Sequence, residues 1–140
     1  MAEDMFLRFP FTYAKVESLG ILFYPIVQLQ LKTIFGWKQF DFLVDTGADL
    51  TTLPFTAASF LGVDLKNLKQ SKTQGVGGIF VSTWDLNLPI KIGPYELRVH
   101  ASITKDKTTP FLLGRKDIFE EKFNLILDSR RKITAISENA

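Results

Sequence analysis

The fold of this chain is decided by ten residues in its first half, Phe40-Asp41-Phe42-Leu43-Val44-Asp45-Thr46-Gly47-Ala48-Asp49. Their apolar, strand-like part ends abruptly at Asp-Thr-Gly, which predicts a carboxylate at the point where a buried strand turns into a loop. Burying an ionised carboxylate is costly unless the surroundings compensate its charge. We therefore interpret Asp45 as a candidate functional residue.

The composition is that of a globular protein, with 46% hydrophobic and 23% charged residues among 140. That length fits one domain, which we expect to span residues 1–140 with a core at about 22–137 and an N-terminal extension at 1–21. The formal net charge of +2 is too small to indicate a nucleic-acid partner. There is no cysteine and only one histidine, so thiol chemistry and a multi-histidine metal site are excluded, and we expect no metal and no cofactor.

The N-terminal residues and the length of the apolar runs indicate how the protein is targeted in the cell. It begins Met1-Ala2-Glu3-Asp4, without the basic start and the apolar run of a signal peptide. No apolar run approaches the roughly 18 residues that a membrane-spanning helix needs. We therefore expect a cytoplasmic protein with no membrane partner.

Alternating apolar and polar residues, separated by turn residues, predict a mostly β chain. Strands are expected at residues 5–13 (interrupted near Pro10), 22–34, 37–44, 51–53, 79–91, 96–104 and 111–114, with a terminal hairpin from 124–128 and 132–136. Pro54 and Gly62 bracket a short helix at 56–61, and a second short helix is expected at 115–122. The pattern favours a closed-barrel-like fold with one or two short helices.

Asp45 would gain a clear chemical role from a second carboxylate. Two carboxylates that share one proton can place a base and an acid on either side of a water molecule and a peptide carbonyl. The chain contains one Asp-Thr-Gly, so a two-fold homodimer would bring the second copy of Asp45 to the axis. Thr46 would then lie near that axis, and Gly47 would allow a tight backbone beside the carboxylate.

Three short motifs follow one another along the chain, and both their order and their spacing are informative. They are Leu43-Val44-Asp45-Thr46-Gly47-Ala48-Asp49, then the glycine-rich Gly75-Val76-Gly77-Gly78, then Leu112-Leu113-Gly114-Arg115. In order and spacing they resemble the retropepsin-like family, the retroviral-type, single-domain aspartic proteases, over roughly residues 28–123. In that family the second motif lies in the flap hairpin, and the third precedes a helix.

The resemblance implies a homodimeric acid protease fold and assigns roles to residues. Asp45 would be the catalytic residue, one per subunit, with Thr46 and Gly47 as hydrogen-bonded support at the dimer axis. Asp49 and Arg115 would form the ion pair that braces the active-site loop. The flap and pocket residues that would hold substrate are Gly75, Val76, Gly77, Gly78, Ile79 and Leu112.

The sequence therefore predicts an aspartic endopeptidase that activates a water between the two Asp45 carboxylates of a homodimer and cleaves an extended peptide or protein. Residues 1–22 and the hairpin after Phe123 exceed the compact viral pattern, which predicts a differently built dimer interface. Three alternatives stay open. They are a non-catalytic or weakly active binding and dimerisation module, a processing unit of a larger polyprotein or retroelement, and a half site that needs a different partner chain.

Overall fold

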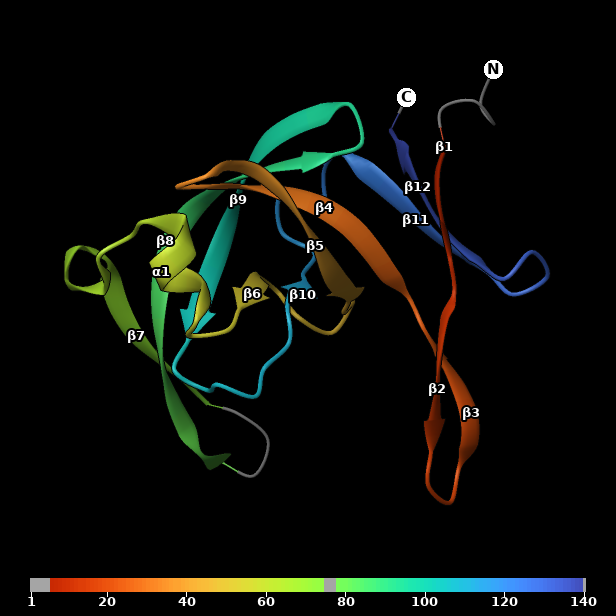
Figure 1. Ribbon diagram of the computed structural model, residues 1–140, viewed down its shortest axis with the longest axis horizontal. Helices are drawn as coiled ribbons and strands as arrows, with labels where there is room; N and C mark the ends of the chain where they lie inside the picture. The colour runs from red at the N-terminus through yellow and green to blue at the C-terminus, as the bar shows by residue number, and fades with distance from the viewer. Residues whose placement is uncertain (1–5, 75–77, 140) are drawn as a thin grey trace.

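The computed structural model describes residues 6–74 and 78–139, and these fold mainly into β-strands (Figure 1). The helices among them are α1 (Ala57–Leu61) and the 3₁₀-helix η2 (Leu65–Asn67). Neither of these described helices has the length and apolar character needed to cross a membrane. The strands are β1 (Phe6–Pro10), β2 (Thr12–Val16), β3 (Gly20–Tyr24), β4 (Ile26–Thr33), β5 (Gly36–Val44), β6 (Thr51–Leu53), β7 (Lys69–Gln74), β8 (Phe80–Ile92), β9 (Tyr95–Thr104), β10 (Leu112–Leu113), β11 (Phe123–Asp128) and β12 (Ile133–Glu138).

Six strands close into a barrel. The largest sheet has the order β4-β5-β10-β6-β9-β8-β7, and a further pairing between β4 and β8 joins its two sides at Leu31 and Ile90. The two-residue strand β10 runs parallel to β5 and antiparallel to β6. Because Leu113 lies opposite Val44 in this register, the residues that follow the two strands, Asp45 and Gly114, emerge side by side.

The core follows the alternation that predicted the strands. On β4, Val27, Leu29 and Leu31 point inward and are fully buried, while their neighbours are more exposed. Fully burying one such aliphatic side chain stabilises a fold by about 1.5–3 kcal/mol. The largest fully buried side chains are Phe42, Leu29, Leu31, Leu53, Leu88, Ile90, Ile92, Ile103, Leu113, Ile118, Ile136 and Val27. They come from most elements of the barrel, so the closed sheet surrounds one shared core.

Pro25 changes the expected strand at residues 22–34. Proline has no N–H to donate to a ladder, and the run divides there into β3 and β4. The N-terminal strand divides likewise, at Phe11, into β1 and β2. Strand β1 pairs with β12 in a three-stranded sheet with β11, whereas β2 and β3 form a separate two-stranded hairpin.

The β2–β3 hairpin, which we call the arm, projects away from the barrel at the lower right of Figure 1. Its exposed apolar residues are Tyr13 (50% exposed), Leu19 (67%), Ile21 (73%) and Phe23 (42%). Tyr13 lies opposite Phe23 in the ladder, and Ile21 lies opposite Lys15, so these side chains share one face. The arm therefore presents an apolar face that packs little against the rest of its own chain.

The second expected helix, at residues 115–122, is wrong. These residues form turns, because Asp117 adopts a left-handed backbone with φ of 67° that a right-handed helix cannot continue. The Asp117 carboxylate accepts the His100 backbone N–H at 2.8 Å, and this contact with β9 holds the turn. The first expected helix is confirmed as α1, which ends at Gly62 with φ of 70°.

Candidate active site

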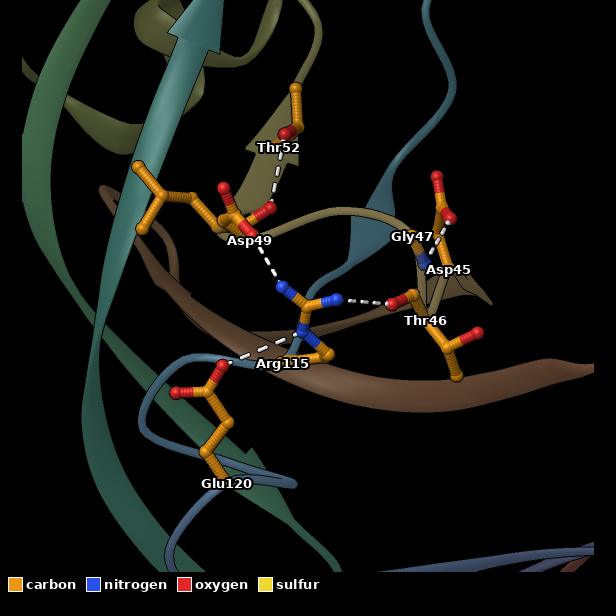
Figure 2. Close-up of polar contacts among 8 residues, drawn as sticks. Asp45, Thr46, Gly47, Asp49, Thr52, Arg115 and Glu120 are labelled. Carbon is orange, nitrogen blue, oxygen red and sulfur yellow. Dashed lines mark hydrogen bonds and ion pairs between the residues drawn. The ribbon is translucent and has the colours of Figure 1, made fainter.

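Asp45 lies directly after β5, on a turn that backbone contacts hold from both sides. Figure 2 shows the Asp45 carboxylate beside Gly47 and the Arg115 side chain beside Thr46. Its N–H donates to the Leu113 carbonyl at 3.0 Å, and its carbonyl accepts the Ala48 N–H at 3.1 Å. Its carboxylate Oδ1 accepts the Gly47 N–H at 3.0 Å. Asp45 is half-buried within the single chain, so its carboxylate is less enclosed than the sequence indicated.

Arg115 lies in the loop after β10, and its side chain contacts both ends of this turn. Its Nη1 donates to the Thr46 carbonyl at 2.8 Å, and its Nη2 forms an ion pair with Asp49 Oδ1. A third contact joins Nε to Glu120 Oε1 at 3.4 Å. An exposed ion pair contributes only about 0–1 kcal/mol to stability, and the Asp49 side chain is 84% exposed. The main effect of the Arg115 side chain is therefore to hold the Thr46 carbonyl, on the backbone directly before Gly47.

Gly114 lets the two loops approach closely. Its N–H donates to the buried Thr51 hydroxyl at 3.2 Å, and the next two residues donate to the Ala48 and Asp49 carbonyls at 3.1 and 2.9 Å. A Cβ atom added at Gly114 would lie 2.4 Å from the Leu50 carbonyl carbon and oxygen. Only glycine fits this position without a shift of the backbone.

We expect Gly114→Ala to destabilise the protein, because its methyl group would push residues 50 and 51 away from the loop. Overpacking of this kind typically costs about 1–3 kcal/mol. The measurement is the midpoint of urea unfolding followed by circular dichroism. An unchanged midpoint would contradict the close approach of the two loops.

A cavity of about 490 Å³ opens next to the Asp-Thr-Gly turn. Its wall is formed by residues 48–50 of the loop after β5, by Thr52 of β6, and by side chains of β8, β9 and the loop after β9. The cavity therefore adjoins the turn that carries Asp45.

The predicted flap residues are only partly described. Gly75, Val76 and Gly77 lie outside the described residues. Strands β7 and β8 pair as far as Gln74 and Phe80, so residues 75–79 connect them. Gly78 has φ of 78°, and the Ile79 side chain is 68% exposed.

The other predicted residues lie on the barrel. Leu112 is half-buried in β10, opposite Leu43 and Thr52. The structure thus brings together Asp45, Thr46, Gly47, Asp49 and Arg115. In the described ranges, 6–74 and 78–139, no three metal-ligating side chains gather into a potential metal site.

Sequence reasoning missed two acidic residues near the site. The helix expected at residues 115–122 does not indicate the contact between Glu120 and Arg115, because residues five positions apart do not face each other on a helix. Asp106 lies between the strands expected at residues 96–104 and 111–114, and no local pattern indicates that this segment borders the cavity.

The closed barrel is the fold of the retropepsin-like aspartic proteases. A solved retropepsin-like aspartic protease from Rickettsia conorii matches with a TM-score of 0.60 and 21% identity, over 95% of this chain and 91% of that chain. The EIAV protease, solved in complex with the inhibitor HBY-793, matches with a TM-score of 0.53 and 20% identity, over 73% of this chain and 88% of that chain. The mostly β, closed-barrel acid protease fold predicted from the sequence is therefore confirmed.

The family follows from a separate comparison. The chain belongs to the family described as "gag-polyprotein putative aspartyl protease", which matches residues 32–119. A search of curated proteins found none that matches this chain. The matched residues include the Asp-Thr-Gly turn, the β7–β8 hairpin and the loop of Arg115.

Proposed function

We propose that this protein is an aspartic endopeptidase that works as a homodimer. The observation that carries the proposal is the Asp45 turn, whose backbone is bonded to Leu113 and Arg115 while its carboxylate accepts a hydrogen bond from Gly47 and stays half exposed. The fold holds this carboxylate in place and leaves it accessible. That combination suits a group that must meet both a substrate and a second carboxylate.

The chemistry requires two copies of Asp45 that share one proton. The ionised carboxylate takes a proton from a water molecule as the water oxygen attacks the peptide carbonyl carbon, and the protonated carboxylate gives its proton to the carbonyl oxygen. The tetrahedral intermediate then collapses: one of its hydroxyl groups returns a proton to the ionised carboxylate, the protonated carboxylate gives its proton to the amide nitrogen, and the C–N bond breaks, which restores the singly protonated pair. No covalent enzyme intermediate forms.

A homodimer is supported by the exposed surface next to Asp45. Thr46 and Gly47 are exposed, so the surface that would meet a partner turn is open in the single chain. The Val44 N–H donates to the Pro25 carbonyl at 2.9 Å, which joins the base of the arm to the last residue of β5, directly before Asp45. The base of the arm therefore lies beside the strand that leads to Asp45, and we assign the apolar face of the arm to a second copy of this chain.

We expect the double variant Leu19→Ser/Ile21→Ser to weaken the dimer at least about tenfold, because two large apolar side chains would lose their burial against the partner. The measurement is sedimentation velocity over a range of protein concentrations. Ile34→Ser/Phe35→Ser is the matched control, since these residues are 60% and 74% exposed at the β4–β5 turn. Equal dissociation constants for both double variants would contradict the role of the arm.

The substrate in this proposal is an extended peptide or a protein segment that can become extended. The test is incubation of the protein with denatured proteins at several values between about pH 3 and pH 8, with and without pepstatin, a mimic of the tetrahedral intermediate. We expect cleavage that pepstatin blocks. Binding of the denatured proteins without cleavage at any of these pH values would favour the binding module instead.

A further inference from the structure

The cavity beside the Asp45 turn combines an apolar wall with a carboxylate at its edge. Ala48 and Leu50 contribute apolar surface from the loop after β5, and Val81 contributes it from β8. Asp106, on the loop after β9, also lines the cavity and is exposed. A side chain that enters along the apolar wall would therefore end near a negative charge.

Asp106 is held in a fixed position by its own loop. Its Oδ1 accepts the Thr108 hydroxyl at 2.7 Å and the Thr108 N–H at 2.9 Å, and its own N–H donates to the Thr104 hydroxyl at 3.2 Å. The Thr108 hydroxyl, followed by the Thr108 N–H, lowers the pKa of Asp106. The carboxylate therefore stays ionised at mildly acidic pH, where a pair of aspartates that share a proton can work.

None of the other charged residues near the cavity forms an ion pair with Asp106 among the described residues. Asp49 also lines the cavity but forms an ion pair with Arg115. Lys105 and Lys107, the neighbours of Asp106 in sequence, are exposed. Among the described residues, neither lysine forms an ion pair with Asp106. Asp106 is therefore the charge at this edge that a bound substrate would meet.

We propose that this cavity is a side-chain pocket that selects lysine or arginine at a substrate position close to the cleaved bond. Lysine and arginine bury their aliphatic stems along apolar surface and keep their charged heads in water. Here the stem would lie against Ala48, Leu50 and Val81, and the charged head would reach Asp106. The inference rests on the proposed endopeptidase function, because it names which substrates the same site prefers.

The position within the substrate follows from the geometry of extended chains. Successive side chains of an extended peptide point to opposite faces and advance by about 3.3 Å per residue. The cavity is lined by residues 48–50 of the turn, whereas Asp45 itself does not line it. The side chain in the pocket is therefore near the cleaved bond but not at it.

The experiment measures peptide binding by the inactive Asp45→Asn protein, so that it does not depend on cleavage. Peptides that differ only in lysine or uncharged norleucine, placed in turn at each position near the expected cleavage site, are titrated by fluorescence anisotropy. At one position we expect lysine to bind about two- to fivefold more tightly, as an exposed ion pair allows. Adding Asp106→Asn should remove that difference, because asparagine keeps the acceptor for Thr108 but loses the charge.

Two further variants test whether the preference for lysine depends on the charge of Asp106. Asp64→Asn changes a carboxylate that accepts the Lys66 N–H at 3.0 Å and does not line this cavity, so it should keep the preference. Asp106→Lys should shift the preference from lysine to glutamate. Equal binding of lysine and norleucine at every position, or no peptide binding at all, would overturn the pocket. Cleavage of denatured proteins by the unaltered enzyme would in that case still support the endopeptidase.

Discussion

Asp45→Asn is expected to abolish peptide cleavage. In a homodimer the single substitution removes both the base and the acid, so the loss should exceed the factor of about 10²–10⁴ that one such group contributes. Asparagine keeps an oxygen at the position of Oδ1, which accepts the Gly47 N–H at 3.0 Å. The fold should therefore survive, and the loss should be one of chemistry.

The measurement is the turnover of a peptide substrate, with the thermal midpoint recorded on the same samples. Asp41→Asn is the matched control, because Asp41 lies exposed on the same strand and accepts a hydrogen bond from Gln28 at 3.1 Å. We expect full activity from the control and none from Asp45→Asn at a similar midpoint. Cleavage that survives Asp45→Asn would contradict the mechanism.

Arg115→Ala is expected to lower both activity and stability. The variant loses the hydrogen bond to the Thr46 carbonyl and the ion pair with Asp49, so the turn that carries Asp45 keeps its backbone contacts but loses its side-chain brace. A displacement of about 1 Å in a catalytic group can cost about 10² in rate. The lost hydrogen bond from a charged donor, discounted because the Arg115 side chain is 37% exposed, should cost about 1–2 kcal/mol of stability.

The experiment compares kcat/KM and the urea unfolding midpoint of Arg115→Ala with those of Arg131→Ala. Arg131 also faces a carboxylate, Asp128 at 3.9 Å, but in the exposed turn between β11 and β12. We expect the Arg131 variant to resemble the unaltered protein. Arg115→Lys should recover part of the activity, because an ammonium group keeps the charge but not the fork that reaches two partners. An Arg115→Ala variant with unchanged activity and midpoint would refute the bracing role.

Patterns of neighbouring residues were sufficient to predict those parts of the fold that depend on short-range interactions. The alternation in β4 and β5, the helix between Pro54 and Gly62, and the turn at Asp-Thr-Gly all depend on neighbouring residues and were predicted. The Asp49–Arg115 contact joins residues 66 positions apart. It was expected only because three motifs occur together in the order of a known family.

The remaining features depend on contacts between distant segments. The turn at residues 115–122 is held by Asp117 against His100 of β9, which a helical periodicity does not reveal. The break between β3 of the arm and β4 of the barrel follows from Pro25. The projection of the arm could not be predicted in this way, because it depends on β2 and β3 pairing only with each other. The cavity edge at Asp106 is formed by strands and loops far apart in sequence. Such contacts between distant segments can be recognised only from the folded structure.

The shared pair of Asp45 carboxylates is tested most directly by mixing subunits. Unaltered and Asp45→Asn chains are unfolded together in equal amounts, refolded, and assayed at a fixed total concentration. If each site needs two copies of Asp45, random pairing leaves about a quarter of the dimers active, and activity per unaltered chain falls to about half. Activity per unaltered chain that stays constant as the Asp45→Asn chain is added would show that one chain suffices, and would contradict the account.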